Sequence, residues 1–203
     1  MSPYLPSLIY FTQTMSLLFK SPPKIRTKIS HLSTFSMENG RSSVSFNNDP
    51  ILTNKKASIG FTLPPCEPGL KPKDNSIMIP AFHLHPSQSE TFLITSGNAL
   101  FTLNRKTITI KSGEDITIPK GEYHRFTNAS STEPMSLEAW YDPADLVREE
   151  RVFRNLCGYL SDHCSGKGGM LENMSILQLS LFAWEAEAML CAPSKLHFLH
   201  SLY

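Results

Sequence analysis

The sequence predicts a β-sandwich or β-barrel followed by a helical extension, because the residue pattern changes near residue 142. Between Ser76 and Tyr141, short runs rich in Ile, Thr and Phe alternate with turn-forming pairs such as Gly97-Asn98 and Lys120-Gly121. Many short strands without helices between them are typical of a sandwich or barrel. After Asp142-Pro143, apolar residues recur at helical spacing instead. The chain is therefore expected to be all-β with helices at its C-terminal side.

Composition divides the chain into three segments. Residues 1–45 are rich in Ser, Thr and basic residues and contain no acid before Glu38, which is typical of a disordered leader or an organelle transit peptide. Residues 46–142 form the predicted barrel, which opens with a proline-rich stretch suited to extended arms and edge strands. Residues 143–203 form the predicted helical extension.

The expected strands lie between the turn residues, and two helices follow them. The strands are Ile77–His85, Glu90–Thr95, Ala99–Leu103, Lys106–Ile110, Asp115–Ile118, Tyr123–Asn128 and Met135–Tyr141. Asp142 as N-cap, with Pro143 as the first helical residue, predicts a helix over Ala144–Leu160. A glycine-rich break at Gly166–Gly169 precedes a second apolar helix over about Ser175–Leu190.

The overall composition excludes several classes of protein. A formal net charge of +1 gives no reason to expect a nucleic acid as partner. No apolar stretch reaches the roughly 20 residues that a transmembrane helix needs. The four cysteines are widely spaced and form no CxxC pair, so they are expected to be reduced thiols in an intracellular protein. We expect a cytoplasmic protein, with mitochondrial import as the alternative that the basic leader leaves open.

Three histidines and a glutamate have the spacing of a metal site. His83 and His85 are separated by one residue, so on a strand they project to the same side. Glu90 begins the next predicted strand, and His124 follows a Pro119-x-Gly121 turn that can aim it at the same cavity. Imidazole and carboxylate are donors that divalent first-row metals prefer, and four such ligands leave coordination positions open. We expect one divalent transition metal, with iron placed first and manganese, nickel, cobalt and zinc as alternatives; a metal-free pocket is the other reading.

Strand parity predicts which other side chains line the pocket. Alternate residues of a strand face the same side, so two positions should share the face of Glu90 and one that of His124. These inward candidates are Phe92, Ile94 and Phe126. Trp140 or Tyr141 is expected to close one end, and Glu138, on the face of Trp140, is the candidate for a second acid–base group. Such a cavity suits a small, mostly apolar ligand with one chelating group, although these side chains also fill any narrow barrel.

The two segments that carry the metal ligands resemble the paired motifs of the cupin superfamily. Residues 83–97 fit the motif G(X)5HXH(X)3–4E(X)6G from the histidines onward, with Ile77 in place of its first glycine. Residues 113–128 fit G(X)5PXG(X)2H(X)3N completely. The resemblance extends over roughly residues 50–142. It implies a single-domain (type-2) cupin: a double-stranded β-helix, or jelly-roll, barrel that is commonly a homodimer. The metal ligands that it implies are His83, His85, Glu90 and His124.

A second resemblance concerns the first predicted helix. Glu150–Asn155 running into Gly158–Leu160 is similar to a group of fungal single-cupin proteins, some of them cupin-domain oxidoreductases of polyketide gene clusters. This implies a metal-dependent oxidoreductase acting on a small organic molecule in secondary metabolism. Two alternatives stay open: a metal-dependent isomerase, cyclase or decarboxylase, in which the metal stabilises an enolate, and a non-catalytic small-molecule-binding cupin. The fold cannot choose among them, since one fold hosts many chemistries.

Overall fold

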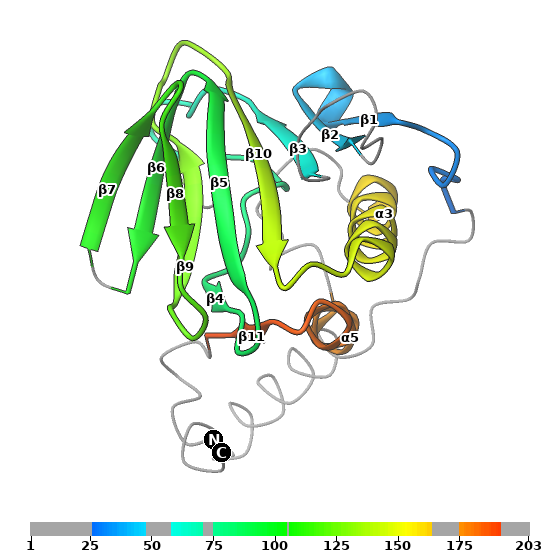
Figure 1. Ribbon diagram of the computed structural model, residues 1–203. Coiled ribbons are helices and arrows are strands. Elements are labelled where there is room, and N and C mark those ends of the chain that lie inside the picture. The colour runs from blue at the N-terminus through cyan, green and yellow to red at the C-terminus, as the bar shows by residue number, and fades with distance from the viewer. Residues whose placement is uncertain (1–25, 48–57, 71–74, 105, 164–174, 192–203) are drawn as a thin grey trace, which may run out of the picture.

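The computed structural model describes residues 26–47, 58–70, 75–104, 106–163 and 175–191, which form two antiparallel sheets with helices along one side (Figure 1). The six-stranded sheet contains, in order, β1 (Thr34–Met37), β2 (Ser42–Asn47), β3 (Ser58–Leu63), β10 (Met135–Asp142), β5 (Ser89–Ser96) and β8 (Asp115–Ile118). The five-stranded sheet contains, in order, β11 (Met189–Leu190), β4 (His83–Leu84), β9 (His124–Asn128), β6 (Asn98–Leu103) and β7 (Lys106–Lys111). The helical elements are η1 (Glu38–Gly40), α3 (Leu146–His163) and α5 (Ile176–Glu185). The predicted all-β jelly-roll fold with a C-terminal helical part is confirmed.

The core between the two sheets is built from alternating strand residues. Along β5 and β10, every second side chain is buried while its neighbours are partly exposed. Phe92 of one sheet meets Phe101 and Phe126 of the other, with ring centroids 5.1 and 5.2 Å apart. Aromatic pairs at such distances contribute about 0.5–1.5 kcal/mol each beyond the burial of their area. The two sheets are thus held face to face next to the predicted metal ligands.

Gly97, a motif residue, makes the tight connection between β5 and β6 possible. Its φ is +74°, in the left-handed region, and a Cβ built on it would lie 2.6 Å from the carbonyl oxygen of Pro134. Any larger residue would have to displace backbone there, because that distance is shorter than van der Waals contact. Gly97 is therefore needed for the backbone to make this turn, and it has no direct part in holding a metal.

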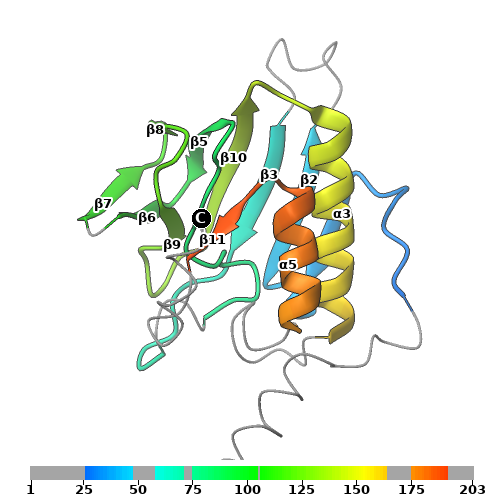
Figure 2. The ribbon, with the colours of Figure 1, turned by 90° about the horizontal axis from the view of Figure 1, so that it is seen from below.

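The helices α3 and α5 lie side by side along β2 and β3 (Figures 1 and 2). Phe153 of α3 packs edge-on against Phe61 of β3, with ring centroids 5.3 Å apart. The Arg154 guanidinium lies 3.9 Å above the Phe46 ring and donates hydrogen bonds to the carbonyl oxygens of Ile29 and Leu32. The helical part is therefore packed into the same core as the barrel. Among the residues described, no helix is long and apolar enough to cross a membrane.

The N-terminal boundary differs from the prediction. Residues 34–45, expected to belong to a poorly ordered leader, form β1 and most of β2, and β2 pairs with β3. The expectation of disorder was therefore wrong for these residues. Phe35, Met37 and Val44 are buried and are flanked mainly by Ser and Thr, an alternation typical of a half-buried strand that the overall Ser-rich and basic composition of the segment outweighed in the prediction. The predicted leader function concerns mainly residues 1–25, which lie outside the described residues.

The predicted strand Ile77–His85 shortens to β4 (His83–Leu84), so this expectation was also wrong for residues 77–82 and for His85. Ile77 is buried, at 1% exposure, but lies in an irregular segment outside any strand. In place of a neighbouring strand, a side chain satisfies its backbone N–H. The Glu38 carboxylate accepts hydrogen bonds from the Ser76 hydroxyl at 2.5 Å and from the Ile77 N–H at 3.2 Å. Ile77 is not among the described residues with positive φ, so the site tolerates its replacement of the motif glycine.

Both helix boundaries shift as well. Asp142 stays in β10, paired with Ser89, and the capping side chain of α3 is Asp145, whose carboxylate accepts from the Arg148 N–H at 3.1 Å. The second helix ends at Glu185 instead of Leu190. The chain then turns through Glu187, at φ +49°, into β11. The sequence pattern could not show this turn because β11 exists only by pairing with β4, far away in the chain.

Candidate metal centre

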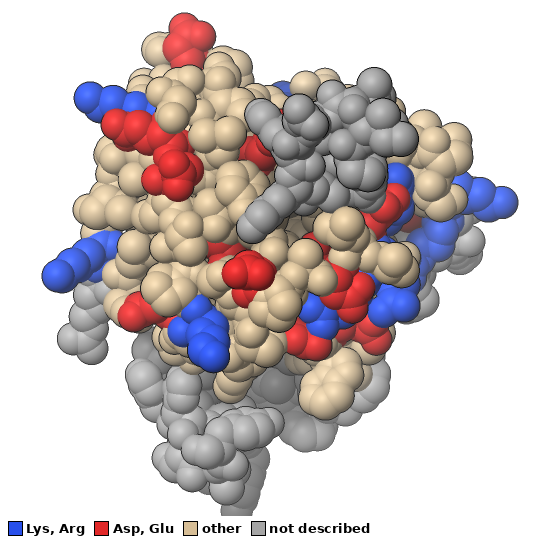
Figure 3. All heavy atoms as spheres, in the orientation of Figure 1, with Lys and Arg blue, Asp and Glu red and all other residues tan. Residues whose placement is uncertain are grey.

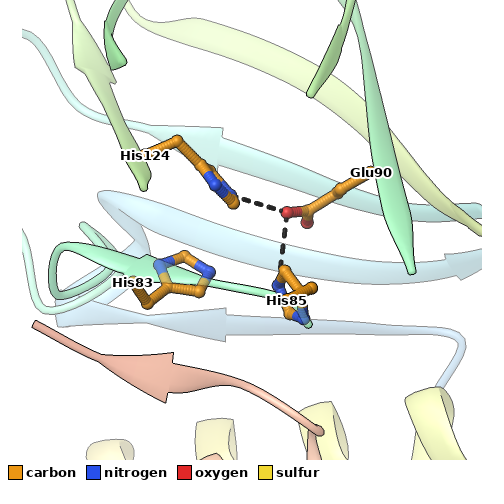
Figure 4. A group of neighbouring side chains, drawn as sticks. All are labelled: His83, His85, Glu90 and His124. Carbon is orange, nitrogen blue, oxygen red and sulfur yellow. Dashed lines mark hydrogen bonds and ion pairs between the residues drawn. The ribbon is translucent and has the colours of Figure 1, made fainter. Parts of the chain in front are cut away.

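The four predicted ligands converge from three strands and the loop between β4 and β5 (Figure 4). His83 of β4 and His124 of β9 are direct partners across the sheet, with ring centroids 4.5 Å apart. His85 follows β4, and Glu90 reaches the same point from β5 of the opposite sheet. One potential ligand atom from each residue lies within 4.8 Å of all the others.

Glu90 is the electrostatic centre of this cluster. One of its carboxylate oxygens lies 2.8 Å from Nε2 of His124 and 3.5 Å from Nε2 of His85 (Figure 4). These three side chains are almost fully buried, whereas His83 is partly accessible. A buried carboxylate without partners would be very unfavourable, so the histidines are what make this position tolerable.

Backbone carbonyls orient two of the imidazoles. Nδ1 of His83 lies 2.8 Å from the carbonyl oxygen of Ala81, and Nδ1 of His124 lies 3.0 Å from that of Glu122. A carbonyl oxygen can only accept, so Nδ1 carries the proton in both rings. Their Nε2 atoms are left as the metal-binding nitrogens, and this is the usual way in which outer partners orient metal ligands.

The pKa values of the cluster are coupled. Burial raises the pKa of the Glu90 carboxyl, but the hydrogen bond with His124 and the interaction with the nearby His85 outweigh this effect and hold that pKa well below its usual range. Burial lowers the pKa of His124, yet its hydrogen bond and charge interaction with Glu90 raise it overall. Burial and the neighbouring His124 lower the pKa of His83 to about 4. Without a metal, the favoured state is thus an imidazolium–carboxylate pair between His124 and Glu90, beside a neutral His83.

His85 provides the test of whether a metal fits here. Its ring is 4% exposed, and neither ring nitrogen makes a hydrogen bond among the residues described; the only ion-pair contact of the ring among them is the one from Nε2 to the Glu90 carboxylate, at 3.5 Å. A buried polar group left unpaired costs about 1–3 kcal/mol, which a metal–nitrogen bond would remove. Together with the other two imidazoles and the Glu90 carboxylate, this donor set suits a divalent first-row metal. The residues present therefore fit such an ion.

The second motif anchors its turn on the first. The N–H of Gly121, whose φ is +83°, donates to the carbonyl oxygen of His85 at 2.8 Å. The side chain of Asn128, at the other end of β9, donates to the carbonyl oxygens of Pro64 at 3.0 Å and Glu133 at 2.8 Å. Both ends of the strand that carries His124 are thereby fixed, which explains the fixed spacing of the motif.

A cavity of about 110 Å³ opens beside the cluster and extends to the helices. Apart from His83, His85 and Glu90, the residues that line it are Phe61, Met78, Pro80, Ala81, Phe126, Tyr141, Val152, Phe153, Leu156, Cys157, Leu160, Leu179, Phe182, Ala183, Ala186, Ala188 and Leu190. Tyr141 lies edge-on to His85, with ring centroids 5.2 Å apart. Burial and the charge of the nearby Glu90 carboxylate raise the pKa of the Tyr141 hydroxyl well above its usual range.

The predicted pocket residues divide into three groups. Phe126 lines the cavity, while Phe92 and Ile94 face inward but lie in the core between the sheets, at 1% and 0% exposure. Glu138 and Trp140 do not line the cavity, so that expectation was wrong. They point to the other face of β10 from Tyr141, and the Glu138 carboxylate accepts a hydrogen bond from Ser58 at 3.3 Å. Tyr141 is the residue that borders the site.

A polar network that was not predicted from the sequence connects α3 with the loop between β4 and β5, residues 85–88 (the ligand loop). The amide of Gln88, two residues before Glu90, donates to the carbonyl oxygen of Pro143 at 2.6 Å and to the Glu149 carboxylate at 3.3 Å. Glu149 also accepts from the N–H of Asp145 at 2.8 Å, and burial raises the pKa of its carboxyl. No sequence signal could connect Gln88 and Glu149, because they are 61 positions apart and share no motif.

The α5–β11 turn is fastened to the same region by Glu187. Its carboxylate accepts a hydrogen bond from the Ser87 hydroxyl at 2.5 Å and forms an ion pair with Arg148 of α3. Charged side chains of both signs therefore gather around α3 and α5 (Figure 3). These contacts hold the helical part against the loop between His85 and Glu90.

Comparison with known proteins supports the family resemblance. Residues 73–141 match the family model described as "Cupin domain". This range includes both motifs and all four predicted ligands, and it supports placing this part of the chain in the cupin superfamily. No protein of curated function matches the chain.

Several solved structures are distantly similar. A predicted oxalate decarboxylase from Thermotoga maritima shares 20% identity over 57% of this chain and 96% of its own, with a TM-score of 0.39. The cupin domain of Schizosaccharomyces pombe Cnp3 shares 15% over 63% and 79%, with a TM-score of 0.37. A DMSP lyase shares 20% over 49% of this chain, with a TM-score of 0.35, and this chain spans 46% of the length of that protein. Such distant likenesses do not assign a function.

Proposed function

We propose that the protein is a metal-dependent cupin enzyme that binds one divalent transition metal through His83, His85, Glu90 and His124 and acts on a small organic molecule. The observation that carries this proposal is the convergence of four donor groups, three of which (His83, His85 and Glu90) border an apolar cavity. The buried His85 adds to it, since neither of its ring nitrogens makes a hydrogen bond within the described residues and Nε2 has only the 3.5 Å contact with Glu90. A structural metal would need no adjoining cavity, whereas a catalytic one does.

Some residues of the site would bind the metal ion, and others would exclude water from it. A bound metal would supply Lewis acidity and, if it is iron or manganese, redox chemistry. The three imidazoles and Glu90 would hold the ion, while the carbonyls of Ala81 and Glu122 keep two of the imidazoles in the binding tautomer. The apolar wall would keep water away from the reacting group, which strengthens every electrostatic interaction there.

The finer proposal is an oxidoreductase of secondary, polyketide-type metabolism. Its support is the similarity of Glu150–Asn155 and Gly158–Leu160 to fungal cupin-domain oxidoreductases. Both segments lie on α3, whose Leu156, Cys157 and Leu160 border the cavity, so a resemblance in this helix bears on the choice of substrate. A cytoplasmic homodimer is proposed on the sequence features given above.

Tyr141 favours a second candidate, a metal-dependent isomerase, cyclase or decarboxylase. This buried residue borders the cavity, and the nearby Glu90 carboxylate contributes to the raised pKa of its hydroxyl. A hydroxyl in that position could give or receive a proton at the substrate, and these reactions need proton transfer without a net change of oxidation state.

Metal content, measured by inductively coupled plasma mass spectrometry on tag-free protein, tests the proposal. We expect near-stoichiometric transition metal in the wild type and at least about a tenfold loss in the double variant His83→Ala/His124→Ala, because even outer-shell changes cost about 10–100-fold in affinity. His31→Ala, an exposed histidine away from the site, is the matched control and should keep its metal. Full occupancy in the double variant would contradict the ligand assignment.

The identity of the metal then separates the two candidate reactions. Substrate conversion that requires iron and consumes oxygen would support the oxidoreductase. Conversion that persists with zinc and without air would support the isomerase, cyclase or decarboxylase.

A further inference from the structure

The cavity has a polar end and an apolar end. The polar residues at its border are Tyr141 and three of the metal ligands, His83, His85 and Glu90, which come from the sheets and the loop between β4 and β5. Beyond them the cavity reaches α3 and α5, where it is bordered by Val152, Phe153, Leu156, Cys157, Leu160, Leu179, Phe182, Ala183 and Ala186. None of the described residues lining it is Lys, Arg, Ser, Thr, Asn or Gln.

We propose that the ligand of this site is a small molecule with one oxygen-donor head group and a neutral, apolar body, and that α5 determines how long this body can be. The proposal rests on the proposed metal site, because the head group is placed at the metal ligands. It excludes dicarboxylates, sugars and phosphate esters as ligands of this cavity.

The absence of polar groups from the helical end is what excludes them. A second carboxylate or a phosphate would have to leave water and lie among Leu, Phe and Ala side chains, where no described cation could pair with it. A sugar would leave several hydroxyls without partners for the same reason. An alkyl or aryl body gains free energy instead, at about 0.8 kcal/mol for each buried methylene, which corresponds to about fourfold in affinity.

The small residues of α5 and the turn after it leave the space that the body would occupy. Ala183, Ala186 and Ala188 border the cavity where larger side chains would fill it. Ala183 lies inside α5, while Ala186 caps its end, so Ala183 is the position where a larger side chain disturbs the helix least. Leucine at this position keeps a high helix propensity and adds bulk toward the cavity.

The test uses full-length, tag-free protein loaded with Co²⁺, whose visible absorption reports a ligand entering the coordination sphere. The probes are the straight-chain hydroxamic acids from acetohydroxamic to octanohydroxamic acid, and adipic acid monohydroxamate, which carries a terminal carboxylate. We expect the affinity to rise about fourfold per methylene until the cavity is full. Adipic monohydroxamate should bind at least about tenfold more weakly than hexanohydroxamic acid, because its second carboxylate would be buried unpaired.

Two α5 variants test the role of the helix. Ala183→Leu should weaken hexanohydroxamic acid by at least about tenfold while leaving acetohydroxamic acid and Co²⁺ binding unchanged, because only the longer body reaches α5. Ser180→Leu, at an exposed position of the same helix, should change none of these affinities. Thermal unfolding of both variants shows whether each remains folded.

The outcomes separate this inference from the proposed function. Chain-length-independent affinity, or equal binding of adipic monohydroxamate, with normal Co²⁺ binding would overturn the inference alone. Failure of the wild type to bind Co²⁺ would overturn the proposed function and the inference with it. An unchanged affinity of Ala183→Leu for hexanohydroxamic acid would refute the role of α5.

Discussion

Replacement of Glu90 by glutamine should destabilise the metal-free protein, and by an amount that depends on pH. The variant removes the charge that pairs with His124 at 2.8 Å in a site where both side chains are at most 6% exposed. Breaking a buried ion pair by removing one partner costs about 3–5 kcal/mol, and the glutamine amide can still bond to the imidazole. We therefore expect a loss near the lower limit, about 3 kcal/mol in the free energy of unfolding.

The pH range of this loss follows from the two pKa shifts. The pKa of His124 is raised in the folded protein, so its contribution is complete below its ordinary value of 6.5 and disappears as the pH rises through the folded-state pKa. The pKa of Glu90 is lowered, so its contribution is complete above its ordinary value of 4.5 and disappears as the pH falls through the folded-state pKa. The largest loss is thus expected between about pH 4.5 and 6.5.

Urea unfolding of chelator-treated protein at pH 5.5 and at pH 8.5 measures this difference. Glu133→Gln, at an exposed position outside the site, is the control and should change the free energy of unfolding by less than about 0.5 kcal/mol at either pH. The reasoning would be refuted by a loss for Glu90→Gln that is below about 1 kcal/mol at pH 5.5, or that is equal at the two pH values.

Three further predictions concern the metal, the ligand loop and a buried thiol. Added Co²⁺ or Zn²⁺ should raise the melting temperature of the wild type more at pH 8 than at pH 6, because metal binding must displace the proton shared by His124 and Glu90; an equal rise at both pH values would argue against that displacement. Glu149→Ala should lower the free energy of unfolding by about 1–3 kcal/mol by leaving Gln88 with a buried unpaired donor, and should weaken metal binding in a titration, whereas Glu149→Gln should retain most of both. Burial raises the pKa of the Cys157 thiol to about 12, so a thiol reagent at pH 8 should label it in unfolded but not in folded protein, as read by peptide mass spectrometry.

The metal ligands could be found from the sequence because their positions depend on short-range rules. One residue between His83 and His85 places both on one side of an extended segment, and their rings lie 5.0 Å apart. The turn before His124 depends on Gly121 and its positive φ, which a local motif also records. Such features need no knowledge of the rest of the fold.

Strand parity was less informative where both faces of a strand carry large side chains. In β10, Leu137 and Tyr141 alternate with Glu138 and Trp140, and either set could be the inner one. Packing against the opposite sheet selects Leu137 and Tyr141, because a shift of one residue would exchange the two faces. The sequence therefore identified the strand but not its inner face.

The sequence alone determined the class of fold, the two motifs and the four donor groups, since all of these follow from periodicity, turn chemistry and spacing within one segment. Only the tertiary structure decided what surrounds them. The contact of Phe153 with Phe61, the bond between Gln88 and Glu149, and the pairing of β11 with β4 join segments that are far apart in the chain. Local propensities carry no record of such partners, because each contact forms only when the whole core packs, and it is these contacts that close the cavity beside the metal ligands.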